Sequence, residues 1–190
     1  MVSLMPDLFA PQAYNNAWSN HRLLRACGQL SAADLAATRP CFFGSIIATL
    51  NHILIVDWFY VSALEGACIG SDAFVDELQN PDLEAQLSAL REVARRLIAV
   101  TEDATLSNPV RRVQMIRGSG VQEDRFDRTF LHLIQHQIHH RGQVHGLLSM
   151  TDVAPPQLDE FYMAWDMDAT RRAPDFAEMG LSEDDIWAGR

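Results

Sequence analysis

Apolar residues recur at three- and four-residue steps in four long stretches of the chain. This spacing places them on one face of an α-helix, so each stretch predicts a helix that packs against others. The stretches cover residues 12–30, residues 45–64, a run that begins at Asn80-Pro81 and reaches Ile98, and residues 124–150. Four long helices are typical of a helical bundle.

The second stretch is apolar on nearly every side, which predicts a helix at the centre of the bundle. Its β-branched residues also suit a strand, but about twenty residues without a turn signal exceed the usual strand of about 5–6 residues. The longest uncharged run, from Pro40 to Val56, is interrupted by Asn51 and His52. A membrane-spanning helix needs about 20 apolar residues. We therefore expect a soluble protein with no membrane partner.

Shorter elements are expected between and after the long helices. Ser31 can cap one short helical turn, and Ser182 can cap another near the C-terminus. Residues 103–123 contain Asn-Pro and Gly-Ser-Gly turn signals, which fit an extended loop or a short hairpin. A Pro-Pro pair introduces a last helical stretch over residues 158–165. No strand ladder is expected, so the predicted fold is an all-α four-helix bundle with short extra helices.

The chain of 190 residues is long enough for one domain and too short for two. We assign residues 1–165 to the bundle and residues 166–190 to an acidic tail that packs on the same domain or trails from it. Residues 151–190 hold ten acids and three arginines, or −7 of the net charge of −10. The remaining −3 is spread over residues 1–150. Neither part offers the basic stripe that nucleic acid needs, so we expect no nucleic-acid partner.

All fifteen basic residues are arginine, which excludes a lysine Schiff base or a P-loop lysine. The three cysteines are widely spaced and form no C-x-x-C motif, which predicts reduced thiols. The first residues have neither a basic start nor a long apolar run, so a signal peptide is not expected. These features together predict a cytoplasmic protein.

Five of the seven histidines fall in a span of fourteen residues inside the fourth predicted helix: His132, His136, His139, His140 and His145. His136 and His140 project roughly 40° apart on one face, the geometry in which two imidazoles share a metal ion. His132 extends this face by one turn, and Gln143 lies roughly 20° from His136. His139 and His145 are expected to point elsewhere. Because the H-x-x-x-H spacing also arises on solvated faces, the pair alone leaves both interpretations open.

A third ligand would have to come from another element, and His52 in the apolar second helix is the best candidate. An unpaired buried ring there would cost on the order of 1–3 kcal/mol, so it needs a partner. Metal coordination would satisfy it, as would a hydrogen bond to Asp57 or to a backbone carbonyl.

Four residues near these histidines in sequence have expected roles of their own. Asp57 lies roughly 140° round the helix from His52, so it either orients a neighbour or makes a structural hydrogen bond. Phe59 is interpreted as core or pocket wall. Arg141 fits a packing or salt-bridge role better than binding of an anionic substrate. Gln137 stands where a zinc protease has its glutamate, which disfavours that reaction.

These residues resemble the signature of the DinB/YfiT-like metal-binding four-helix bundles. The fourth predicted helix contains the run HQIHHRGQ from His136 to Gln143, and the second contains LNHI followed by Asp57-Trp58. The approach FGSI at residues 43–46 and the segment PPQLD after the fourth helix also fit, and the resemblance covers residues 8–165. It implies an up-down-down-up, left-handed bundle with one divalent metal ion held by three histidines. The positions that match the family's ligands are His52, His136 and His140. His132 has no role in the family motif and is kept as a reserve ligand. Members of the family also often pair, so a homodimer is an expectation.

Three imidazole ligands leave coordination positions open to water or substrate. A divalent ion held in this way can acidify water, polarise a carbonyl or stabilise a thiolate. Imidazole accepts several ions, and we expect zinc or nickel before iron or manganese. The predicted function is a metal-dependent enzyme, a thiol transferase or hydrolase, that acts on a small molecule with or without a low-molecular-weight thiol. The alternatives are a metal-binding bundle without turnover, in a structural or stress-response role, and a helical interaction module without metal.

Overall fold

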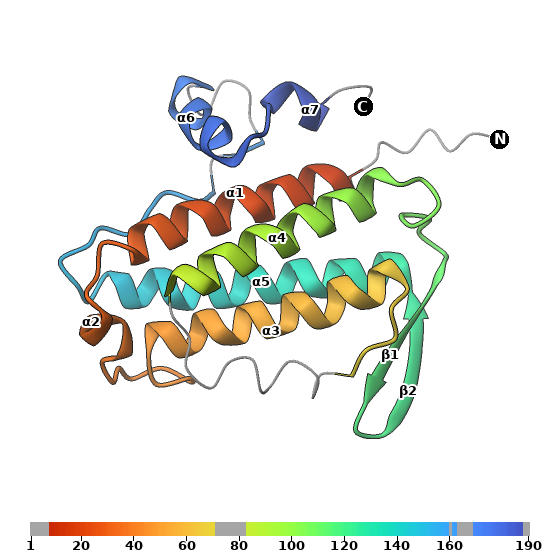
Figure 1. Cartoon of the computed structure of the whole chain (residues 1–190), viewed down its shortest axis with the longest axis horizontal. Coiled ribbons are helices and arrows are strands. Elements are labelled where there is room, and N and C mark those ends of the chain that lie inside the picture. Colours follow the sequence, from red (N-terminus) through yellow and green to blue (C-terminus); the bar gives the residue numbers. More distant parts are fainter. Residues whose placement is uncertain (1–7, 71–82, 160, 163–168, 188–190) are drawn as a thin grey trace.

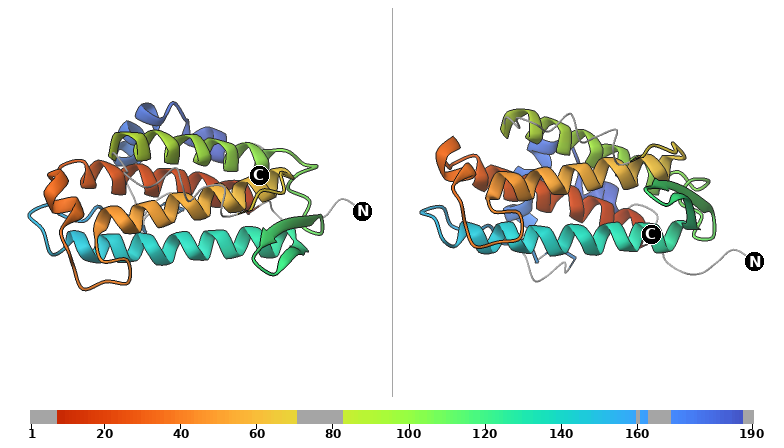
Figure 2. Two further views of the ribbon diagram at one scale, coloured as in Figure 1. Left: turned by 60° about the horizontal axis from the view of Figure 1, so that its bottom comes forward. Right: turned by 90° about the horizontal axis from the view of Figure 1, so that it is seen from below.

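Four long helices lie side by side in the computed structural model, which describes residues 8–70, 83–159, 161–162 and 169–187. They are α1 (Phe9–Cys27), α3 (Ile46–Glu65), α4 (Leu83–Glu102) and α5 (Phe126–Leu148) (Figure 1). Helices α1 and α3 each contact both α4 and α5 (Figure 2). In Figure 1, α1 and α5 run in one direction and α3 and α4 in the other. All four predicted long helices are therefore present.

The helix ends follow from local capping chemistry. The side chain of Ser45 accepts a hydrogen bond from the amide of Ala48 at 3.2 Å, which fixes the start of α3. Gly66 ends α3 with φ of +94°, a left-handed conformation that glycine adopts without strain. Helix α1 begins three residues earlier than predicted, because Pro11 stands in its first turn, where no amide hydrogen needs a helical partner. The predicted Asn80-Pro81 cap lies outside the described residues.

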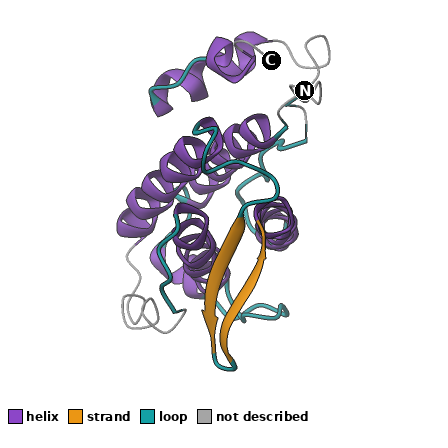
Figure 3. Ribbon diagram, turned by 90° about the vertical axis from the view of Figure 1, so that its right-hand side faces the viewer, coloured by secondary structure: helices purple, strands orange, loops and turns teal. Residues whose placement is uncertain are grey.

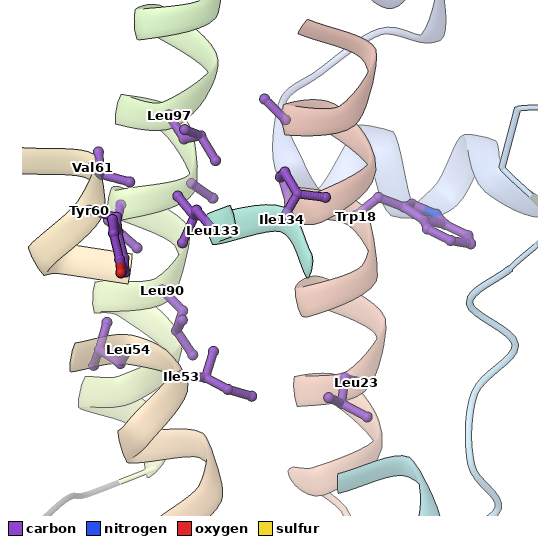
Figure 4. Packing of buried hydrophobic residues seen from close by; sticks show 14 of the residues in the cluster. Trp18, Leu23, Ile53, Leu54, Tyr60, Val61, Leu90, Leu97, Leu133 and Ile134 are labelled. Carbon is purple, nitrogen blue, oxygen red and sulfur yellow. The ribbon is translucent and has the colours of Figure 1, made fainter. Parts of the chain in front are cut away.

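Apolar side chains from all four helices meet in one core (Figure 4). Figure 4 shows Ile53 and Leu54 from α3 near Leu90 from α4, with Leu133 and Ile134 from α5 alongside. Among the described residues, α3 alone is long and apolar enough to cross a membrane, but 61% of its most apolar window is buried inside the protein. Its apolar surface is thus largely used by the core, as a central helix requires.

The expectation of an all-α chain without a strand ladder is wrong. Residues 112–125 form an antiparallel hairpin of β1 (Arg112–Arg117) and β2 (Gly120–Arg125), with Arg117 paired to Gly120 across the turn. The hairpin lies at the end of the bundle where α3 ends and α5 begins (Figures 1 and 3). Val113 and Met115 alternate into the core, which anchors β1. Of the two alternatives for residues 103–123, the hairpin is present. Helix α5 begins at Phe126, two residues later than predicted, because β2 extends to Arg125.

The C-terminal region also differs from the prediction. Residues 158–159 and 161–162 are not helical, and the rest of that predicted helix lies outside the described residues. Phe161 is buried, with its ring 5.3 Å from that of Trp18, so this residue is held by packing against α1.

The acidic tail contains two short helices that contact α1, namely α6 (Ala169–Met179) and α7 (Glu183–Trp187). Asp175 of α6 accepts hydrogen bonds from Trp18 at 3.1 Å and from Arg22 at 2.6 Å. The hydroxyl of Ser182 accepts a hydrogen bond from the amide of Asp184, as expected of a cap. The boundary between residues 165 and 166 lies outside the described residues. The short helix α2 (Ala32–Ala36) has Ser31 as its N-terminal cap, as predicted.

Candidate metal centre

Three histidines from two antiparallel helices meet between α3 and α5. His52 comes from α3, and His136 and His140 come from α5. One ring nitrogen from each lies within 4.8 Å of the other two, and the Nε2 atoms of His52 and His136 are 3.0 Å apart. Among the residues that the structure describes, this is the one group of three or more histidine, cysteine or acidic side chains spaced to hold a metal ion.

The environment keeps these imidazoles neutral, which is the form that binds metal. Burial, and to a lesser degree the nearby His140, lowers the pKa of His52 to about 4. Burial and the neighbouring histidines lower the pKa of His136 to about 3. Burial also lowers the pKa of His140, although its hydrogen bond to Gln143 opposes the shift. At neutral pH the site therefore offers three uncharged nitrogen donors.

Gln143 fixes the tautomer of one of these rings. Nδ1 of His140 donates to Oε1 of Gln143 at 2.8 Å, while the amide nitrogen of Gln143 lies 3.2 Å from Nε2 of His139. Because Nδ1 of His140 carries the proton, its Nε2 keeps a free lone pair. Gln143 thus lies where the helical spacing placed it, and it prepares His140 to act as a donor.

An aromatic ring that the sequence did not assign to the site covers one side of the cluster. Phe43 stacks on His52 with the ring centroids 4.3 Å apart, and its centroid is 5.4 Å from that of His140. Gly44, with φ of +81°, turns the chain between Phe43 and the cap of α3. The feature of the sequence that could have indicated this contact is an aromatic residue two positions before the cap. This feature predicts the contact of Phe43 with His52 only when the geometry of the turn at Gly44 is known.

Two predicted neighbours lie away from the three histidines. His132 is exposed, and its ring centroid is 6.5 Å from that of His136 and 5.1 Å from that of Tyr60. Phe59 is buried against Tyr60 and the guanidinium of Arg117, toward the hairpin.

The other two histidines near one another in sequence, His139 and His145, are not part of the group of three. His139 is exposed, although its ring centroid is 4.8 Å from that of His140. His145 is hydrogen-bonded to the carbonyl of Pro156 at 3.0 Å. His145 thus points away from the cluster, whereas His139 borders it through Gln143.

Asp57 lies behind the cluster and positions the turn of α5 that carries His136. It is 2% exposed and accepts a 2.6 Å hydrogen bond from Nε2 of Gln137, the residue that follows His136. Burial raises the pKa of Asp57 to about 7, and the charge of Arg141 opposes that shift. This hydrogen bond fits both roles expected for Asp57, because it is a buried structural contact and it holds the residue next to His136.

Arg141 leaves α5 on the side that faces α1. It is 4% exposed, and its Nη1 donates to the side-chain oxygens of Asn16 and Asn20. Burial lowers its pKa to about 10, so it is charged at neutral pH. Arg141 has a packing role, as predicted, but with amide partners in place of a salt bridge.

These observations define a mostly helical protein in which neutral histidines from two helices form a cluster suited to a divalent metal ion. The DinB family profile matches residues 6–174, and the chain belongs to the DinB family. This match confirms the resemblance seen in the sequence and extends it into α6. None of the curated proteins compared with the chain matches it.

Proposed function

We propose that this protein is an up-down-down-up four-helix bundle that binds one divalent metal ion through His52, His136 and His140. The convergence of three uncharged ring nitrogens from two helices, all within 4.8 Å of one another, carries this proposal. The opposite directions of the α1/α5 and α3/α4 pairs support the bundle topology. Membership of the DinB family supports both parts.

The residues present fit a zinc or nickel ion. Imidazole ligands bind zinc at about 2.0–2.1 Å, which in a tetrahedral site puts the nitrogens about 3.3 Å apart. The His52–His136 nitrogen separation of 3.0 Å is close to this value, and the nitrogen of His140 lies within 4.8 Å of both. The hydrogen bond from His140 to Gln143 supplies the outer partner that metal-bound histidines usually have.

We further propose that the site catalyses transfer of a low-molecular-weight thiol to a small molecule. A bound ion would supply Lewis acidity, which stabilises a thiolate at neutral pH. Hydrolysis is less favoured, because no carboxylate of the described residues lies in the cluster to accept a proton, and the amide of Gln137 stands where zinc proteases place their glutamate. Phe43 gives a substrate an apolar wall beside His52.

Metal analysis of protein purified without a histidine tag tests the first part. We expect about one divalent ion per chain, which a chelator removes. The metal-loaded protein would then be incubated with a panel of electrophiles and glutathione or a related thiol, and loss of free thiol would be measured. A stoichiometric ion without turnover across the panel would favour the bundle without turnover, and protein free of metal would contradict the site itself.

A further inference from the structure

An open cavity of about 590 Å³ lies on the opposite side of α5 from His140, between α1, α5 and the extended segment after α5. Its apolar wall comes from Ile138 of α5 and from prolines and a leucine of that segment. Its polar side chains are those of Arg141 and His145 of α5, two residues of α1 and three of the segment after α5, namely Asn15, Ser19, Gln157, Asp159 and Tyr162, so the cavity holds one acid beside its one arginine. None of the three clustered histidines lines it, so this cavity is separate from the candidate metal centre.

Arg141 is the residue in this cavity that needs explaining. A cation that is 96% removed from solvent normally lies against a carboxylate, because desolvation of an unpaired charge is costly. Among the described residues, no carboxylate lies within 4.0 Å of its guanidinium, although Asp57 and Tyr162 are near enough to act on its charge without an ion pair. Both of its hydrogen bonds come from Nη1 and go to uncharged amides. No described side chain accepts from Nε or Nη2, although the residue borders the cavity.

We propose that this cavity is a binding site for a small organic carboxylate, which pairs with the free edge of the Arg141 guanidinium. A planar carboxylate matches two parallel N–H donors of arginine and would give Arg141 the direct ion pair that the described residues do not provide. Arg141 is the one arginine that lines the cavity, and the chain has no lysine, so a single negative charge is favoured over a phosphate dianion. The apolar wall of Ile138, Pro155 and Pro156 fits a ligand with an apolar body.

Sodium benzoate is a suitable probe, and benzamide is its uncharged analogue of nearly the same shape. Calorimetric titration of the full-length protein should show saturable binding of benzoate and binding of benzamide at least about tenfold weaker, which corresponds to about 1.4 kcal/mol. His52→Ala protein, in which the metal centre is disrupted, should bind benzoate as the unaltered protein does. Loss of benzoate binding in that variant would mean that benzoate binds at the metal centre and would overturn the proposal.

Two glycines of α5 provide a matched pair of variants. Gly142 lines the cavity and Gly146 does not, and an added Cβ meets no atom within 4 Å at either position. Gly142→Leu should fill the cavity and raise the Kd for benzoate at least about tenfold, whereas Gly146→Leu should leave it within about twofold. Equal affinities in these two variants would contradict a ligand in this cavity.

Removal of the charge completes the test. Arg141→Met should abolish benzoate binding, and where this variant does not fold, the Gly142→Leu and Gly146→Leu pair decides. Inorganic phosphate that binds as tightly as benzoate would overturn the assignment to a carboxylate. Absence of benzoate binding up to about 50 mM, an affinity weaker than about 2 kcal/mol, would overturn the site as a whole.

Discussion

The two sides of α5 handle charge in opposite ways. The side that faces α3 gathers three neutral imidazoles with lowered pKa values, whereas the side that faces α1 buries the charged guanidinium of Arg141. His140 and Arg141 are adjacent in sequence, and the helical turn of roughly 100° per residue sends them to different helices. The proposed ligand is therefore a cation on one side and an anion on the other.

The comparison shows what burial does to each kind of side chain. A buried imidazole loses its proton easily, so it becomes a lone-pair donor without any partner charge. A buried guanidinium stays charged, because even its lowered pKa of about 10 is far above neutrality. The first arrangement is suited to a divalent metal ion, and the second is the one for which we propose an anion.

The largest expected effect comes from removal of a ligand on the α3-facing side. His52→Ala and His140→Ala should each weaken metal binding at least about 1,000-fold, or about 4 kcal/mol, because two imidazoles remain. Metal content after dialysis against a weak chelator measures this loss. His139→Ala is the matched control, since His139 is adjacent to His140 but exposed, and it should keep its metal. If His52→Ala and His140→Ala both retain full metal content, the ligand assignment is wrong.

The next effect concerns Asp57, which lies between the two sides. Its pKa is about 7 in the folded chain against an ordinary value of 3.8, so between these values the folded state holds one more proton than the unfolded state. The contribution of Asp57 to stability is therefore present below about pH 4 and is lost as pH rises to about 7. The Asp57→Asn protein should not show this loss of stability, because asparagine does not titrate.

Urea unfolding at pH 5 and pH 8 measures this difference. The unaltered protein should lose about 2 kcal/mol more of its unfolding free energy over this range than Asp57→Asn does. Asp152→Asn, a substitution of an exposed acid after α5, should follow the unaltered protein. Identical pH profiles for Asp57→Asn and the unaltered protein would show that Asp57 is charged in the folded state throughout.

A smaller effect is expected when the outer partner of His140 is removed. Gln143→Leu deletes the acceptor for Nδ1 of His140, so metal affinity should fall about tenfold, or about 1.4 kcal/mol. A competition titration with a chromophoric chelator gives this affinity. Gln135→Leu, on an exposed position of the same helix, should leave it unchanged. An unaltered affinity in Gln143→Leu would mean that Gln143 does not orient His140.

The smallest effect concerns α3, the helix that carries His52. Ser45→Ala removes the cap of α3 and should lower the unfolding free energy by about 1 kcal/mol. Ser31→Ala removes the cap of the short, largely exposed α2 and should cost less. Thermal unfolding of both variants tests this order. A larger loss in Ser31→Ala would contradict the central position of α3.

Much of the fold and the core of the candidate site followed from the sequence, because both depend on local periodicity. Helical spacing separated His136 and His140 from His139 and His145, and the apolar surroundings of His52 marked it as a polar residue that needs a partner. The long helices were predicted for the same reason, since an apolar stripe and a cap are properties of a few turns of chain.

Only the tertiary structure decided which distant residues meet. The contact of Phe43 with His52, the position of Phe59 toward the hairpin and the contact of Phe161 with Trp18 depend on packing between elements far apart in sequence. The cavity beside Arg141 arises in the same way, because three separate segments enclose it. A sequence pattern reports the angle of a side chain on its own helix, whereas the partner at that angle is set by how the helices pack.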